Sequence, residues 1–328
     1  MSVSAAQSAG SRDALSAYGK QTIKQGSKSF ALASLLFGRD MQADAQMLYA
    51  WCRHCDDVID GQSMGEDAPD AEMTAAERQR RLERLREKTR RSLNGERIGE
   101  PAFDAFAEVA ARHQLPEQYP FDLLAGFALD AEEARFETLD DTLRYCYGVA
   151  GVVGIMMAIL MGVDRDDEET LDRACDLGLA FQITNICRDI YDDARAGRVY
   201  VPAAMLAAEG VASEPAALLD EANKESVWRV AISLLDIADE YYVSATAGVR
   251  RLPPRAAAAV AAARNIYRDI GRRIRDGGPD VWRARVAVPG PRKTMLAISG
   301  LFTGAPSAIF LKTLKTLPKG ALWRRQSM

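Results

Sequence analysis

Two segments of the sequence each contain a pair of aspartates four residues apart. Asp56 and Asp60 form the first pair, and Asp189 and Asp193 repeat the spacing. On a helix, residues four apart project from the same face. Carboxylates on an otherwise apolar helix are costly to bury unless a cation neutralises them. One such pair is more often a solvated helix face, but its repetition indicates two metal-binding faces.

A guanidinium group accompanies each pair, and two amide groups accompany the second. Asn185 precedes Asp189 by one helical turn, and Gln182 continues the same stripe. Ligands that are all oxygen are typical of Mg²⁺ or Mn²⁺ rather than of zinc or copper. Arg53 and Arg188 lie beside the acids, and the planar guanidinium fork pairs well with phosphate. The pattern predicts a Mg²⁺-bridged diphosphate held between two facing helices.

Helices must position these residues, because strand signals are scarce and good helix formers dominate the sequence. Glycine and proline breakers divide it into segments. We predict helices over residues 41–60, 74–93, 102–113, 119–134, 139–162, 167–193, 226–250 and 255–275. Residues 194–225 are expected to form loops and short helices. The fold class is therefore all-α, with one domain over residues 1–288 and a basic, apolar C-terminal tail over residues 289–328.

Composition and charge exclude several classes of protein. The chain has 328 residues, 48% of them hydrophobic, and a net charge of −4, which argues against a disordered chain and a generally basic nucleic-acid binder. The charge is unevenly distributed: residues 1–280 carry −13, whereas nine basic and no acidic residues follow Asp280. Five irregularly spaced cysteines and the lack of a signal-peptide pattern favour a reducing cytoplasm.

Two uncharged segments are long enough to raise the question of a membrane. Residues 145–163 contain four glycines, and a buried core helix is the commoner interpretation of one such segment. Residues 295–311 are flanked by basic side chains. They fit either a helix that lies on an anionic membrane surface or a packed C-terminal helix. We expect attachment to the inner face of a membrane as a peripheral protein.

Four stretches together resemble the squalene/phytoene synthase family, in particular its bacterial carotenoid enzymes. They are Ser27-Lys28-Ser29-Phe30, residues 49–60, the glycine-rich residues 145–154, and residues 182–202. The resemblance implies an isoprenoid-synthase helical bundle around a central cavity. It also implies head-to-head condensation of two geranylgeranyl diphosphates, through prephytoene diphosphate, to 15-cis-phytoene. Mg²⁺ or Mn²⁺ would be the cofactor, and no NADPH is expected.

The resemblance also assigns roles to residues of this sequence. The implied metal ligands are Asp56, Asp60, Asn185, Asp189 and Asp193. The implied diphosphate ligands are Arg53, Arg188, Tyr267 and Arg285. Ser27, Phe30 and Tyr49 would border the first substrate site, and Gln182 the second. The final proton acceptor would be the released diphosphate or Tyr145.

Other functions stay open at this point. A C15 substrate, as in squalene and dehydrosqualene synthases, would need only a shorter cavity. Head-to-tail prenyltransferases and terpene cyclases also use two acidic helices and Mg²⁺, and a non-catalytic assembly factor could keep the fold. The expected partners are geranylgeranyl diphosphate and a membrane surface, with other carotenoid-pathway enzymes as candidates and no nucleic acid.

Overall fold

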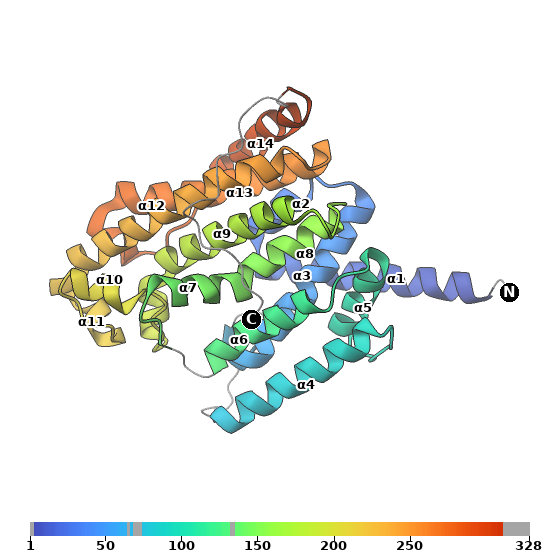
Figure 1. Cartoon of the computed structure of the whole chain (residues 1–328), viewed down its shortest axis with the longest axis horizontal. Helices are drawn as coiled ribbons and strands as arrows, with labels where there is room; N and C mark the ends of the chain where they lie inside the picture. The colour runs from blue at the N-terminus through green and yellow to red at the C-terminus, as the bar shows by residue number, and fades with distance from the viewer. Residues whose placement is uncertain (1–2, 64–65, 68–73, 132–134, 311–328) are drawn as a thin grey trace.

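Long helices make up almost all of the computed structural model, which describes residues 3–63, 66–67, 74–131 and 135–310 (Figure 1). Within these ranges the β-structure is one antiparallel pair of two-residue strands, β1 (Gln62–Ser63) and β2 (Glu66–Asp67). The predicted all-α fold class is confirmed.

The helices follow one another in three groups along the chain. The first group is α1 (Val3–Gly26), α2 (Lys28–Ser34), α3 (Arg39–Asp60), α4 (Ala75–Leu93), α5 (Pro101–His113) and α6 (Gln118–Ala131). The central group is α7 (Leu139–Cys146), the π-helical turn η1 (Tyr147–Gly151), α8 (Val152–Leu160) and α9 (Glu168–Arg195). The last group is α10 (Ala203–Ala208), α11 (Pro215–Leu219), η2 (Glu221–Asn223), α12 (Lys224–Val249), α13 (Pro254–Gly277), η3 (Gly278–Arg283) and α14 (Gly290–Phe310).

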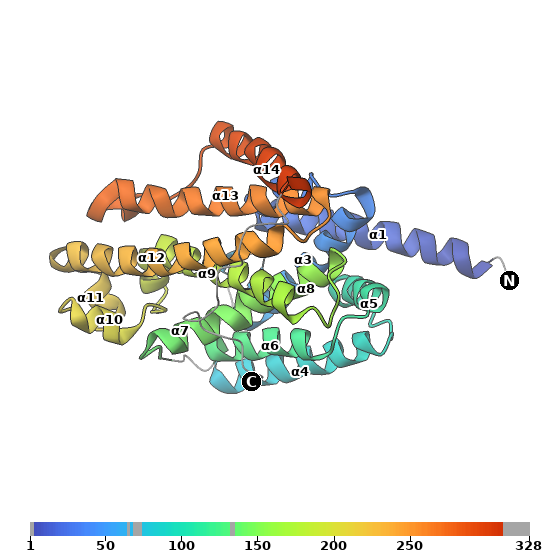
Figure 2. The same cartoon turned by 45° about the horizontal axis from the view of Figure 1, so that its top comes forward.

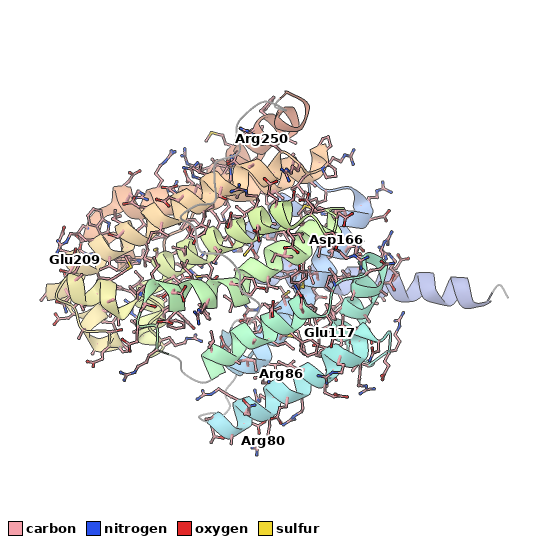
Figure 3. The ribbon with its side chains drawn as sticks, in the orientation of Figure 1. Arg80, Arg86, Glu117, Asp166, Glu209 and Arg250 are labelled. Carbon is pink, nitrogen blue, oxygen red and sulfur yellow. The ribbon has the colours of Figure 1, made fainter. Side chains whose placement is uncertain are left out.

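Helix α9 runs through the middle of the bundle. It packs against η1 and α8 on one side and against α12 and α13 on the other, while α3 packs against α1, α5 and α6 (Figure 1). Figure 2 shows α14 as an outer layer over α13, on the side of the molecule away from α4. Charged side chains such as Arg80 and Glu209 lie at the periphery (Figure 3). The two aspartate-bearing helices are thus inner elements.

Local capping explains where these two helices begin and end. Asp167 caps α9 by accepting a hydrogen bond from the backbone N–H of Thr170 at 3.1 Å. Gly61 ends α3 directly after Asp60, in the left-handed conformation (φ 67°) that favours glycine. Both aspartate pairs consequently lie in the last turns of their helices. The helix dipole disfavours anions there, which increases the need for a cation.

The segment predicted as one helix over residues 139–162 is interrupted by the π-turn η1. At this turn Gly148 meets Gly126 of α6, and a Cβ on Gly148 would lie 2.6 Å from the Gly126 Cα. In the part of the chain that is described, Leu139–Leu160 is the one helical run long and apolar enough to cross a membrane. However, 72% of its apolar 18-residue stretch is buried inside the protein. It is a core segment, as predicted.

The sequence prediction missed the two helices at the N-terminal end of the chain, whereas a helix over residues 295–311 was among its expectations. Residues 3–26 and 28–34 form α1 and α2, although α1 has little apolar periodicity. Residues 290–310 form α14, which packs on α13. The division of the chain at residue 288 stays a prediction. Residues 132–134, predicted to end a helix, and residues 311–328 of the tail lie outside the described residues.

Candidate active site

A cavity of about 930 Å³ lies between α2, α3, α8, α9 and α13. The fourteen side chains singled out from the sequence all line it: Ser27, Phe30, Tyr49, Arg53, Asp56, Asp60, Tyr145, Gln182, Asn185, Arg188, Asp189, Asp193, Tyr267 and Arg285. The structure therefore brings together residues separated by up to about 260 positions in the chain. Their individual roles stay predictions.

Arg53 is held beside the first aspartate pair by two ion pairs on α3. Its Nη1 lies 3.1 Å from Asp56 Oδ2, and its Nη2 lies 2.6 Å from Oδ1 of the buried Asp57. Burial alone would lower the pKa of Arg53, but the charges of these two carboxylates raise it. The guanidinium therefore stays charged and is fixed at the cavity wall.

Arg188 stands in the same relation to the second pair on α9. Its Nε donates to Asp189 Oδ1 at 2.8 Å, and its Nη2 pairs with the other carboxylate oxygen. Burial lowers the pKa of Arg188, but this two-pronged pairing raises it above the ordinary value. Arg285, from the segment after η3, reaches the same carboxylate with its Nε 3.8 Å from Asp189 Oδ1. Asp189 thus contacts two arginines. A metal ion could replace them at this carboxylate, and the two arginines could then bind the diphosphate.

Arg198 joins the two aspartate motifs, and the sequence analysis gave it no role. Its Nη1 donates to Asp60 Oδ2 at 3.3 Å, and its backbone N–H donates to the Asp193 carbonyl at 2.8 Å. The residue follows α9 in the turn at Gly197, whose φ is 79°. A side chain from the end of the second motif therefore contacts the end of the first.

The oxygen atoms at the site fit a hard divalent cation. Asn185 donates through Nδ2 to Gln182 Oε1 at 3.2 Å, which leaves the buried Asn185 Oδ1 without a hydrogen-bond partner. A buried acceptor of this kind is costly unless something satisfies it. Across the described residues, no group of three or more His, Cys, Asp and Glu side chains is close enough to hold a metal. Mg²⁺ is commonly bound through one or two carboxylates together with phosphate oxygens.

Tyr49 and Tyr267 are neutral hydrogen-bonding groups of the cavity. Burial raises the pKa of Tyr49 to about 12 and also raises that of Tyr267. The Tyr267 ring stacks on Phe181 at 4.2 Å between centroids, and the Tyr145 ring stacks on Tyr200 at 4.8 Å. Phe30 packs at 5.7 Å against Tyr49. Ser27 caps α2 by accepting a hydrogen bond from the Phe30 N–H at 3.3 Å.

The rest of the cavity wall is mainly apolar. The aliphatic and aromatic lining residues include Ala33, Phe37, Phe127, Val149, Val153, Met157, Ala158, Met161, Leu177, Phe181, Val249 and Leu252. They extend along α9 as far as Arg173, which lies about 24 Å from Asp189 at 1.5 Å per residue. Arg173 is itself buried, and its Nη1 donates to Ser244 at 2.6 Å. A polar end and a long apolar end share one cavity, which suits a long prenyl diphosphate.

Comparison with known proteins decides the family. The model of the squalene/phytoene synthase family matches residues 23–292. The chain belongs to the squalene/phytoene synthase family. The match spans α2 to the first turn of α14 and thus includes every residue predicted for the site.

Individual relatives agree with this assignment. The chain is 49% identical over 304 residues to a 15-cis-phytoene synthase of Enterobacter agglomerans, covering 92% of this chain and 99% of the relative. It is 51% identical to the enzyme of the same name from Pantoea ananas, covering 85% and 89%. Among solved structures, a dehydrosqualene synthase in complex with ligand superposes with a TM-score of 0.77 at 27% identity, covering 88% and 96%.

Two lysines also line the cavity of this squalene/phytoene synthase family member. Neither was predicted as a site residue from the sequence. They are Lys28 of α2 and Lys293 of α14. Burial lowers the pKa of Lys293, and the neighbouring charges of Lys28 and Arg188 lower it further. Three cations therefore converge at the polar end. Lys28 lies within the Ser27–Phe30 stretch, whereas only the packing of α14 brings Lys293 to the site.

Proposed function

We propose that the protein condenses two molecules of geranylgeranyl diphosphate head to head into 15-cis-phytoene. The observation that carries this proposal is the cavity itself, in which two aspartate pairs and their arginines adjoin a long apolar wall. Relatives named phytoene synthase, 46–51% identical over most of the chain, support the same reaction.

The polar end would bind the two diphosphates and stabilise their departure. Arg53, Arg188, Arg198, Lys28 and Lys293 place positive charge where the leaving groups gain negative charge, which is electrostatic catalysis. Magnesium or manganese, held by Asp56, Asp60, Asn185, Asp189 and Asp193, would supply further neutralisation of that charge. Tyr49 and Tyr267 would add neutral hydrogen-bond donors, since burial raises the pKa of both.

The apolar wall would protect the carbocations. Loss of the first diphosphate leaves an allylic cation, which bonds to the double bond of the second molecule. Loss of a proton then closes the cyclopropane of prephytoene diphosphate. Departure of the second diphosphate, rearrangement and loss of a second proton give phytoene. The balance needs no added electrons, so no nicotinamide is expected, and exclusion of water prevents quenching.

The proton acceptor and the cellular site belong to the same proposal. Tyr145 lines the cavity and is buried, so it or the released diphosphate would take the final proton. All five cysteines are free thiols, which supports a cytoplasmic location. A water-insoluble C40 product supports a position at the inner face of the membrane.

Product analysis tests this function. The purified protein is incubated with Mg²⁺ and either geranylgeranyl or farnesyl diphosphate, each with and without NADPH. We expect phytoene from the C20 substrate without NADPH, and a C30 product formed at least about tenfold more slowly, since an unfilled apolar pocket loses about 1–3 kcal/mol. Preference for the C15 substrate, a longer linear diphosphate or a cyclic diterpene would each overturn the proposal.

A further inference from the structure

The apolar end of the catalytic cavity contains a buried cation that the proposed reaction does not use. Arg173 of α9 lines the cavity and is only 5% exposed. No other arginine or lysine in the part of the chain that the structure describes is buried. Cationic side chains are almost never fully buried unless the protein supplies partners for them. The position of this charge, beside the expected prenyl tails, therefore needs an explanation.

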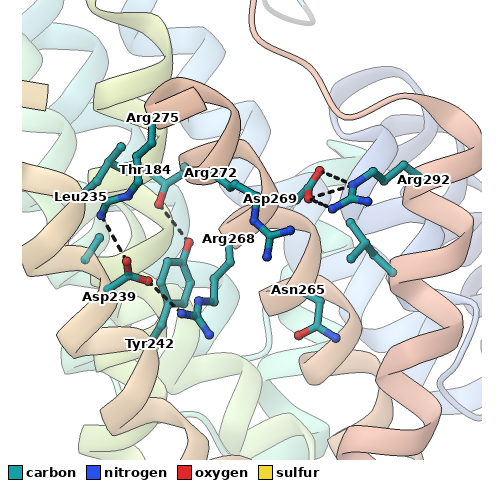
Figure 4. A pocket seen from close by; sticks show the side chains of 13 residues that line it. Thr184, Leu235, Asp239, Tyr242, Asn265, Arg268, Asp269, Arg272, Arg275 and Arg292 are labelled. Atoms are coloured by element: carbon teal, nitrogen blue, oxygen red, sulfur yellow. Dashed lines mark hydrogen bonds and ion pairs between the residues drawn. The ribbon is translucent and has the colours of Figure 1, made fainter. Parts of the chain in front are cut away.

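The arginines of a second, smaller pocket are held differently (Figure 4). This pocket of about 340 Å³ lies between α12, α13 and α14. Arg275 Nη2 lies 3.1 Å from an Asp239 carboxylate oxygen, and Arg292 Nη2 lies 2.6 Å from Asp269. Both arginines are partly exposed and join neighbouring helices near the surface. Arg173, in contrast, faces the cavity in which the substrates would lie.

A buried hydroxyl and a buried carboxylate hold the guanidinium of Arg173. Its Nη1 donates to Ser244 Oγ of α12 at 2.6 Å, and the same hydroxyl donates to the carboxylate of Asp176 on α9. Ser244 and Asp176 are both buried. The carboxylate offsets the charge of the guanidinium, and the hydroxyl connects the two groups. Arg173 is therefore fixed between α9 and α12.

Gly248 of α12 fixes the aliphatic stem of the same side chain. A Cβ on Gly248 would lie 2.6 Å from the Arg173 Cβ and 3.5 Å from its Cγ. The stem thus packs directly on the backbone of α12, and Gly248 also lines the cavity. Because protein interiors are close-packed, Arg173 has no space to retreat toward α12.

Thr170 lies one turn nearer the start of α9 and completes this end of the cavity. Its hydroxyl donates to Asp167 at 2.6 Å and accepts from Arg251 Nη1 at 3.0 Å. Arg173 and Thr170 are the last α9 residues along the cavity. They lie about 24 and 28 Å from Asp189 at 1.5 Å per residue. The apolar wall thus ends at two polar side chains whose hydrogen bonds are made within the protein.

Such an end resists displacement by a longer apolar chain. A flexible methionine at the end of a cavity can change its rotamer and adapt to a larger ligand. Movement of Arg173 would instead break a buried hydrogen bond of a charged group, which costs more than loss of a neutral one. A tail longer than the cavity would therefore meet a rigid stop.

We propose that Arg173, held by Ser244 and Asp176, sets the upper limit of prenyl-tail length at C20. The assignment rests on the proposed function, because the C20 substrate defines that length. Arg173 determines specificity in this account and takes no part in bond formation. A C25 tail, with one further isoprene unit, has to displace the arginine from its partners, whereas a C20 tail ends in front of it.

Calorimetric titration with unreactive analogues tests the proposal. The probes are the C20 and C25 prenyl thiolodiphosphates, in which sulfur replaces the bridging oxygen, each with Mg²⁺. We expect the wild-type protein to bind the C20 analogue at least about tenfold more tightly than the C25 analogue. The double variant Arg173→Ala with Asp176→Asn removes both charges together, which avoids an unpaired buried ion. It should bring the two affinities within about threefold of each other.

Three further variants separate the stop from a purely structural role. Ser244→Ala keeps the arginine but removes its hydrogen bond, so binding of the C25 analogue should improve severalfold relative to the C20 analogue. Arg173→Lys keeps a charged donor and should retain the preference for C20. Arg165→Ala shortens an exposed arginine that precedes α9 and donates to the Gln114 carbonyl. It should leave the preference unchanged.

The proposal is overturned if the wild-type protein binds both analogues equally, or if the folded double variant keeps the wild-type preference. Circular dichroism establishes whether the double variant is folded. If it is not, Ser244→Ala decides, and an unchanged preference in that variant also overturns the proposal. An equal change in Arg165→Ala would do the same. These affinities involve no turnover, so normal binding without phytoene formation would reject the proposed reaction and leave the length limit standing.

Discussion

The guanidinium of Arg198 lies 3.3 Å from a carboxylate oxygen of Asp60, although the two residues are 138 positions apart. The backbone of Arg198 is in turn fixed to the carbonyl of Asp193. The ends of the two aspartate motifs are thereby connected through one side chain. The connection places a cation beside the Asp60 carboxylate at the cavity.

Replacement of Arg198 tests the importance of this connection. Arg198→Gln should lower kcat/KM about tenfold or more, because a charge-assisted hydrogen bond contributes about 1.5–3 kcal/mol. Arg198→Lys should recover part of the loss. Arg195→Gln is the matched control, because Arg195 forms its ion pair with the exposed Asp192 at 3.0 Å and lies over the Tyr191 ring, away from Asp60. Steady-state kinetics that show equal effects of Arg198→Gln and Arg195→Gln would rule out a special role for Arg198.

Tyr145 can be tested as the final proton acceptor. Its ring stacks on Tyr200, so Tyr145→Phe keeps the packing and removes only the hydroxyl. If Tyr145 is the base, phytoene formation should fall about 10²-fold, the usual contribution of a general base, while the first diphosphate is still released. Full phytoene synthesis by this variant would leave the released diphosphate as the acceptor.

The glycines of the central helices are required for close packing. Gly148→Ala should lower the free energy of unfolding by about 1–3 kcal/mol, because the new Cβ would lie 2.6 Å from the Gly126 Cα. Gly290→Ala serves as the control, since nothing lies within 4 Å of a Cβ there. Urea denaturation compares the two variants. A neutral Gly148→Ala would mean that η1 can shift to make room for the added methyl group.

Asp44 should stabilise the N-terminal helices in a pH-dependent way. It is 2% exposed, 2.8 Å from Arg12 of α1 and 2.9 Å from His113 of α5. Burial alone would raise the pKa of Asp44, but the His113 hydrogen bond and the Arg12 charge hold it below 3.8. Its contribution is therefore complete above the unfolded-state pKa and is lost as pH falls through the lower folded value.

Asp44→Asn should accordingly destabilise the protein by about 1–3 kcal/mol at neutral pH, since it removes the negative charge from the hydrogen bonds that the buried carboxylate makes with Arg12 and His113. The difference from wild type should shrink toward pH 3. Asp13→Asn, on the exposed side of α1, should change the free energy of unfolding by less than about 0.5 kcal/mol. A pH-independent difference in urea denaturation would show that Asp44 acts through packing rather than charge.

The sequence analysis predicted those parts of the site that local spacing determines. The four-residue spacing of Asp56 and Asp60 defines a helix face without any tertiary information. Residue spacing could not predict that Lys293 lines the cavity or that Arg198 contacts Asp60. Both depend on how α14 and the turn after α9 pack. The π-turn at residues 147–151 was missed for the same reason, since the meeting of Gly148 with Gly126 is a contact between helices.

In the proposed function, the aspartates of α3 and those of α9 act on the same diphosphates. The most direct test is Mg²⁺-dependent diphosphate release from geranylgeranyl diphosphate by Asp60→Asn and Asp189→Asn, with the exposed Asp192→Asn as control. The account predicts that each of the first two variants loses at least about 10²-fold in rate, as for removal of a group that stabilises transition-state charge, while Asp192→Asn retains the wild-type rate. Full Mg²⁺-dependent release by either Asp60→Asn or Asp189→Asn would contradict it.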